Sequence, residues 1–180
     1  MRKLSMLLVP GLVSMALAAG PMLTSAYAAG SDEPSPPPKS DSSAKKGKKK
    51  SSSISDPIFL AAYRTAYTTI YDGHDYTSAI GQLKSLERDD VADVANLIGY
   101  SYRKLGDYQS SKVYYELALK DDPNHVRTWQ YYGLWQLEQG NREQAQYHLN
   151  KIASLAGTDS SEYRSLAAAL DKPTGATLVY

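Results

Sequence analysis

Two stretches of the chain align without a gap: VANLIGYSYRKLGDYQSSKVYYELALKDDP at residues 94–123 and TWQYYGLWQLEQGNREQAQYHLNKIASLAG at residues 128–157. Every matched pair is 34 positions apart, as positions 99 and 133 are. A fixed period with matched glycine and apolar positions is characteristic of a helical repeat array. The matched pairs are Gly99 with Gly133, Ile98 with Tyr132, Gly106 with Gly140, Ser111 with Ala145, and Tyr115 with Leu149.

The two glycines in register need a packing reason, because glycine in a helix interior costs ~1 kcal/mol relative to alanine. We interpret each repeat as two antiparallel helices. Gly99 and Gly133 would remove a Cβ where the first helix crosses the second, opposite the small residues Ser111 and Ala145. Two unrelated amphipathic hairpins are the alternative, but the gapless match over a whole repeat favours the array.

The repeat length and the order W-x2-L-G-x2-Y…A-x3-F…P resemble those of the tetratricopeptide repeat family. The resemblance implies an all-α, TPR-like helical hairpin solenoid of about three repeats with a C-terminal capping helix. The second copy carries it through Trp129, Tyr132, Gly133, Ala145 and Leu149, and the first through Ile98, Gly99, Tyr102, Ser111, Tyr115, Ala118 and Pro123.

The repeats are expected at about residues 60–91, 92–125 and 126–157, followed by a capping helix at about 160–171. Together they form a domain over residues 55–172, and residues 173–180 are a tail. The first repeat is degenerate, since Tyr67 stands where the other two have glycine. Terminal repeats are often atypical because one of their faces has no neighbour.

Several residues predict where helices begin. Asp56 suits an N-cap with Pro57 at the first helical position, which indicates a helix over 57–71 and a second from 75 to about 86. Asp107 is expected to cap the second helix of the next repeat, and Asn141 with Gln144 resembles a capping box. The capping helix shows an apolar stripe at Tyr163, Leu166, Ala167 and Leu170.

Residues 1–28 have the features of a secretory signal peptide. Arg2 and Lys3 precede a mostly apolar run over residues 4–19, and Ala26-Tyr27-Ala28 forms an A-x-A cleavage site. Cleavage would leave a periplasmic or secreted protein that is not integral to the membrane. An uncleaved anchor is the alternative, although Pro10-Gly11 and Gly20-Pro21 interrupt the apolar run.

Residues 29–54 form a Pro/Ser/Lys-rich linker that we expect to be disordered, because it contains almost no apolar residue to bury. Residues 39–50 carry six lysines and one acid, a charge of +5, whereas from position 54 onward 12 basic and 16 acidic residues give −4. The linker is either a solvated spacer or an adhesive segment for an anionic envelope surface. Nucleic acid is not an expected partner. The adhesive segment would use Lys45, Lys46, Lys48, Lys49 and Lys50.

The sequence indicates no enzyme, metal site or cofactor. The chain has no cysteine, which excludes thiol catalysis and thiolate metal ligands. His74, His125 and His148 have no acidic or histidine partner at metal-ligand spacing, so we interpret them as structural. A nucleophile elbow, a phosphate-binding glycine loop and a His-Glu-x-x-His motif are all lacking.

The family resemblance implies a concave groove lined by the first helix of each repeat. Its mixture of aromatic, amide and cationic side chains suits an extended peptide or a helix. Arg64 and Arg127 lie near positions used by carboxylate-binding members, but Thr68 and Leu97 replace their asparagines, so that specificity is not expected. The candidate partner-binding residues are Arg64, Asn96, Tyr100, Arg103, Lys104, Arg127, Gln130, Tyr131 and Leu134.

These observations predict a non-catalytic protein–protein interaction module, a scaffold or adaptor in the cell envelope that binds another envelope protein or peptide. The alternative is a surface-tethering or structural protein that is attached through its lysine-rich linker, with repeats that only self-associate.

Overall fold

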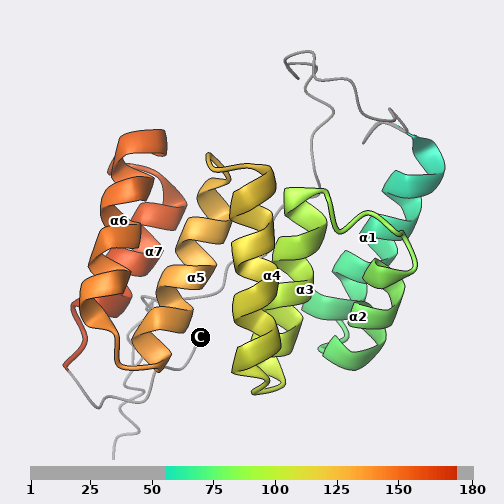
Figure 1. Ribbon diagram of the computed structural model, residues 1–180, viewed down its shortest axis with the longest axis horizontal. Helices are drawn as coiled ribbons and strands as arrows, with labels where there is room; N and C mark the ends of the chain where they lie inside the picture. The colour runs from blue at the N-terminus through green and yellow to red at the C-terminus, as the bar shows by residue number, and fades with distance from the viewer. Residues whose placement is uncertain (1–55, 174–180) are drawn as a thin grey trace, which may run out of the picture.

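The computed structural model describes residues 56–173, which form seven α-helices and no strand. In Figure 1 they lie in one row, from α1 and α2 at one end to α6 and α7 at the other. The expected all-α architecture is confirmed. The predicted signal peptide, the predicted linker and residues 174–180 of the predicted tail lie outside the described residues. The helices are α1 (Pro57–Tyr71), α2 (Tyr76–Lys84), α3 (Ala92–Lys104), α4 (Tyr108–Asp121), α5 (Val126–Glu138), α6 (Arg142–Ala156) and α7 (Ser161–Leu170).

Four helices begin at an oxygen-bearing side chain that accepts a hydrogen bond from a backbone N–H in the first turn. Asp56 caps α1, with Pro57 at the start of the helix, and Asp107 caps α4, as the sequence predicts. Asp75 and Ser160 cap α2 and α7 in the same way. These caps satisfy N–H groups that the helix itself leaves without a partner.

The start of α6 differs from the prediction. Asn141 is the N-cap residue, but its side chain makes no capping hydrogen bond, so the predicted capping box with Gln144 is wrong. The Asn141 amide Nδ2 instead donates to Oε1 of Gln136 at 3.0 Å. Gln136 is buried at the end of α5. Its amide oxygen needs a donor there, and Asn141 supplies it.

The end of α2 comes two residues earlier than the expected position near residue 86. After Lys84 the chain tightens: the N–H of Leu86 bonds to the carbonyl of Leu83, and that of Glu87 to Lys84. Glu87 then takes a positive φ of 50°, which cannot continue a right-handed helix. The turns at Gly106 and Gly140 also have positive φ, 79° and 78°, which glycine adopts without a steric cost.

The helices pack as three successive hairpins, α1 with α2, α3 with α4, and α5 with α6. The first helices α1, α3 and α5 contact one another in turn, and α7 continues this series by packing on both α5 and α6. No helix within residues 56–173 is long and apolar enough to cross a bilayer. One continuous core runs through the stack and includes the fully buried Ile70, Leu83, Leu97, Ile98, Leu134, Ile152 and Leu166.

The two repeat glycines lie at close helix crossings, as predicted. A Cβ on Gly99 would lie 2.9 Å from Cδ1 of Tyr115 and 3.2 Å from the carbonyl oxygen of Ser111, both on α4. A Cβ on Gly133 would lie 2.5 Å from Cδ2 of Leu166. Leu166 belongs to α7, so the capping helix enters the third-repeat crossing, which the repeat pattern did not predict.

Candidate interaction surface

The first helices of the three repeats are joined by a stack of four tyrosines, which we call the tyrosine ladder: Tyr67, Tyr71, Tyr100 and Tyr131. Successive ring centroids are 4.5, 5.6 and 5.0 Å apart. The hydroxyls of Tyr71 on α1 and Tyr131 on α5 lie 3.0 Å apart, although 60 positions separate them in sequence. Aromatic pairs contribute about 0.5–1.5 kcal/mol beyond their buried area, so the ladder ties α1, α3 and α5 together.

The Tyr67 phenol of this surface stays protonated at neutral pH. Burial, followed by the neighbouring Tyr71, raises the pKa of Tyr67 to about 12. Burial also raises the pKa of Tyr63, one turn earlier on α1, well above its ordinary value. The ammonium of Lys104 lies 5.6 Å from the ring centroid of Tyr100, within cation–π range. The surface therefore offers neutral hydroxyls and a nearby cation.

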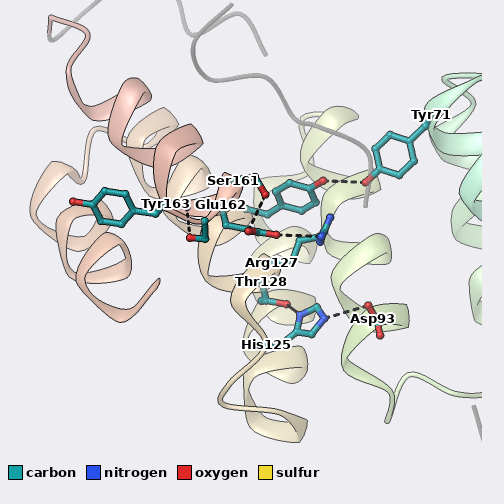
Figure 2. Close-up of polar contacts among 10 residues, drawn as sticks. Tyr71, Asp93, His125, Arg127, Thr128, Ser161, Glu162 and Tyr163 are labelled. Carbon is teal, nitrogen blue, oxygen red and sulfur yellow. Dashed lines mark hydrogen bonds and ion pairs between the residues drawn. The ribbon is translucent and has the colours of Figure 1, made fainter. Parts of the chain in front are cut away.

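One ion pair connects α3 to α5, and a second connects α5 to the capping helix α7. Nε and Nη2 of Arg103 on α3 donate to the two carboxylate oxygens of Glu138 on α5, at 2.9 and 3.0 Å. Nη2 of Arg127 on α5 donates to Oε1 of Glu162 on α7 at 3.1 Å (Figure 2). Each pair spans 35 positions, one repeat plus one residue. These ion pairs thus join α3 to α5 and α5 to α7, along the same row of helices that the tyrosine ladder follows.

A polar network joins α3 to the start of α5, and Figure 2 shows its members His125, Thr128 and Asp93. Nδ1 of His125 lies 2.6 Å from Oγ1 of Thr128, and Nε2 lies 3.2 Å from Oδ1 of Asp93. Oγ1 of Thr128 donates to Oδ1 of Asn96 at 3.2 Å. Asn96 was predicted to face a partner, but here it bonds to the next repeat.

The nine candidate partner-binding residues fall into two groups. Arg64 is exposed and Lys104 and Arg127 are half-buried, so a partner can reach them. The other six are buried, which leaves little of them for a partner to touch; their role in binding stays a prediction. The structure does bring members of both groups together, such as Lys104 with Tyr100. The six buried residues are Asn96, Tyr100, Arg103, Gln130, Tyr131 and Leu134.

Two contributors to this surface, Tyr67 and Glu162, were not among the residues predicted to line it. Glu162 lies on α7, outside the repeat register, so the 34-residue period did not indicate it. A usable signal was present in the sequence, because Arg103 and Arg127 each have a glutamate 35 positions later. Opposite charges separated by one repeat plus one residue indicate contacts between successive first helices.

Asp93, His125 and Thr128 combine an acid, an imidazole and a hydroxyl, yet they do not form an accessible nucleophile. The Thr128 residue is 0% exposed, and its hydroxyl proton is directed at Asn96. A substrate cannot reach an oxygen that is closed to solvent. Within residues 56–173 no cluster of three or more histidine or acidic side chains is arranged to hold a metal ion.

The buried histidine, His148, has a packing role. His148 of α6 lies edge-to-face against Trp129 and Tyr132, with centroids 5.0 and 4.8 Å apart. Its Nδ1 lies 3.2 Å from the backbone carbonyl oxygen of Trp129. Burial lowers the pKa of His148 to about 4, because an apolar site disfavours the charged ring. The imidazole is therefore neutral at neutral pH and fills the α5–α6 crossing.

Comparison with known proteins extends this picture. Residues 102–170 match a family model described as tetratricopeptide repeat. The match runs from the end of α3 to the end of α7 and so contains the complete third repeat and its cap. No curated protein matches the chain. Repeats of this kind generally mediate protein–protein interaction and are typically non-catalytic. Taken with the helical hairpins and the crossing glycines, the match over residues 102–170 supports a tetratricopeptide repeat protein.

Proposed function

We propose that this protein is a non-catalytic scaffold or adaptor that binds another protein of the cell envelope through the surface of its first helices. The observation that carries the proposal is the gathering of aromatic and cationic groups on that surface. Arg64, Tyr67 and Tyr71 come from α1, Lys104 from α3 and Arg127 from α5, and all are at least partly exposed. Tyrosine and arginine are the residues most often found as binding hot spots.

The chemistry of the surface favours an extended segment that carries at least one acidic residue. The hydroxyls of Tyr71 on α1 and Tyr131 on α5 lie 3.0 Å apart, so these side chains already occupy the space between the first and third repeats and favour a narrow segment over a helix. Arg127 makes one bond to Glu162, whereas Arg103 makes two to Glu138 and is almost fully buried. Arg127 is therefore the cation that a partner's carboxylate can reach more easily.

The envelope location is part of the proposal and is supported by the sequence. The charged start at Arg2 and Lys3, the short interrupted apolar run and the Ala26-Tyr27-Ala28 site together favour export with cleavage after residue 28. Sequencing the amino terminus of the exported protein should then begin at Ala29. A chain that keeps Met1 and pellets with membranes would show an anchor instead.

Photo-crosslinking in cells tests the proposed surface directly. A photoreactive phenylalanine analogue would replace Tyr71 in the full chain, with Tyr147 as the matched control. Tyr147 is 49% exposed and lies on α6, a second helix away from the proposed surface. We expect a discrete adduct from position 71, little from position 147, and loss of the adduct when Arg127→Ala is added.

The same experiment has a clear opposing outcome. The first-helix surface would not be the binding site if both positions gave equal adducts. The same would follow if the adduct at position 71 survived Arg127→Ala in a folded protein. Replacing the lysines within residues 39–50 by serine would then show whether attachment depends on the linker. Circular dichroism of each variant confirms that the helices are retained.

A further inference from the structure

The chain leaves the described domain at the turn between α5 and α6. The guanidinium of Arg142, at the start of α6, donates to the carbonyl oxygens of Leu170 and Lys172. These bonds hold the end of α7 against that turn. Pro173 is the last described residue, and residues 174–180 continue from there. We propose that residues 174–180, the tail segment, lie extended across the first-helix surface and occupy it until a partner displaces them.

The first helices end at the edge from which the tail segment starts. Arg103, near the end of α3, pairs with Glu138, the last residue of α5, so these two helices end side by side. Tyr71, the last residue of α1, stacks on Tyr100 of α3, which brings the end of α1 to the same edge. Arg142 follows directly after that edge at the start of α6. The tail segment therefore begins next to the ends of the helices that carry the tyrosine ladder.

The tail segment is long enough to cross the first-helix surface. A fully extended chain spans at most ~3.3–3.6 Å per residue, so residues 174–180 reach ~23–25 Å. The helices α7, α5, α3 and α1 contact one another in turn along the row in Figure 1. Packed helices lie ~8–10 Å apart, so the path from α7 over α5 to α3 needs ~16–20 Å. Residues 178–180 can thus reach α3 and the adjoining end of α1.

The side chains of the tail segment suit the tyrosine ladder. The segment reads TGATLVY and contains no charged side chain. In an extended chain alternate residues face the same side, so Leu178 and Tyr180 face one way and Val179 the other. The two that share a side can pack on the ring of Tyr71 and the stem of Lys104, which are half-buried. Removing these apolar groups from water favours the docked position.

Tethering lets modest contacts hold the tail segment in place. A short flexible linker keeps an attached segment at an effective concentration on the order of millimolar. If the segment covers the surface about four-fifths of the time, only about one-fifth of the molecules are open to a partner. The apparent affinity for that partner then falls about fivefold, because it is reduced by the fraction of binding-competent molecules.

A partner with an acidic residue can displace the tail segment. The segment has no carboxylate side chain to offer Arg64 or Arg127, whereas the proposed partner has at least one. Charge-assisted hydrogen bonds are about twice as strong as neutral ones, so the partner gains contacts that the segment lacks. This displacement rests on the proposed function, whereas docking of the segment on its own domain does not.

Photo-crosslinking of the purified full chain tests the docking without any partner. A photoreactive phenylalanine analogue replaces Tyr180, and equal amounts of ¹⁴N-labelled and ¹⁵N-labelled protein are mixed before irradiation. Mass spectrometry should find cross-links to peptides that contain Tyr71 or Lys104, with both halves carrying the same label. Halves of mixed label would place the segment on a second copy. That result, or cross-links confined to other helices, would overturn the proposal.

Two substitutions within the tail segment provide matched variants for this experiment. Leu178→Ser removes an apolar side chain from the side that Tyr180 shares, and we expect it to lower the cross-link yield about fivefold. Val179→Ser makes a similar change on the opposite side and should leave the yield within about twofold of wild type. An undiminished yield from Leu178→Ser would show that the segment does not pack through this side chain and would overturn the proposal.

Deleting residues 174–180 tests whether the segment competes with a partner. In cells, the deletion should raise the partner adduct from a photoreactive analogue at position 71 about fivefold, with circular dichroism showing that the helices are retained. An unchanged adduct would overturn occupancy of the surface by the segment. The two proposals fail separately: a cross-link from position 180 with no partner adduct from position 71 in either form would remove the proposed partner and keep the docked segment.

Discussion

The second and third repeats carry glycine at the same position but use it differently. Gly99 of α3 meets Tyr115 of its own partner helix. Gly133 of α5 meets Leu166 of the capping helix first, with His148 of α6 next at 3.2 Å. The absence of a Cβ therefore allows close approach of the two helices of one hairpin in the second repeat. In the third repeat it allows three helices to meet. The last repeat of the array has to bind its cap as well as itself, and its crossing is the more crowded of the two.

The largest expected effect comes from filling the crowded crossing. Gly133→Leu should unfold the third repeat and α7, because a Cβ alone would lie 2.5 Å from Leu166 and overpacking costs ~1–3 kcal/mol or more. Thermal and urea unfolding would measure the loss. The control is Gly81→Ala on α2, where a Cβ meets nothing within 4 Å. Alanine there should raise the free energy of unfolding by ~1 kcal/mol at most. If Gly133→Leu melted at the same temperature as wild type, Gly133 would not lie at a close helix crossing.

Breaking the more buried of the two inter-repeat ion pairs should lower the free energy of unfolding more than breaking the more exposed one. Arg103→Met leaves Glu138 without its two-bond partner in a site where the arginine side chain is 1% exposed, so we expect a loss of about 3 kcal/mol. Arg127→Met breaks a single bond between side chains that are 20% and 16% exposed, so the loss should be about 1 kcal/mol. Urea unfolding of both variants compares the junctions. The reverse order would mean that burial does not set their contributions.

The α5–α6 crossing should weaken in acid. The unfolded chain binds a proton at His148 below its ordinary pKa of 6.5, while the folded site resists protonation until about pH 4. Stability is therefore complete above about pH 6.5 and declines as pH falls toward 4, by at most about 3 kcal/mol. His148→Gln should remove this part of the pH dependence in denaturant unfolding. An unchanged pH profile in that variant would show that another group is responsible.

The smallest effect is expected at the second-repeat crossing. Ser111 has a buried hydroxyl oxygen with no hydrogen-bond partner among the described residues, and the matching position of the third repeat is Ala145. Ser111→Ala removes that oxygen and should leave stability unchanged or raise it by up to ~1 kcal/mol. A clear loss of stability in urea would mean that the hydroxyl is bonded after all.

Local signals predicted most of the fold. The caps at Asp56 and Asp107 and the 34-residue period placed the helices, because these signals depend on residues close in sequence. The prediction of the binding surface was less accurate. The repeat register indicates which face of a helix a residue occupies, but it does not indicate how closely the first helix of the next repeat packs against that face. Tyr131 and Arg103 are buried for that reason. Glu162 was missed because α7 follows no repeat pattern.

The central claim is that the first helices of successive repeats lie against one another, and engineered disulfides test it most directly. The chain has no cysteine, so each introduced pair reports alone. The side-chain oxygens of Asn96 on α3 and Thr128 on α5 lie 3.2 Å apart. We therefore expect Asn96→Cys with Thr128→Cys to form a bridge. The control, Lys112→Cys with Gln146→Cys, places exposed cysteines one repeat apart on α4 and α6, which do not contact.

Under mild oxidation we predict an intramolecular bridge in the first pair and none in the control. The bridge would be seen on non-reducing gels as a mobility shift that a reductant reverses. Failure of the first pair to bridge in a folded protein, or equal bridging of the control, would contradict the side-by-side packing of the first helices and with it the surface they form.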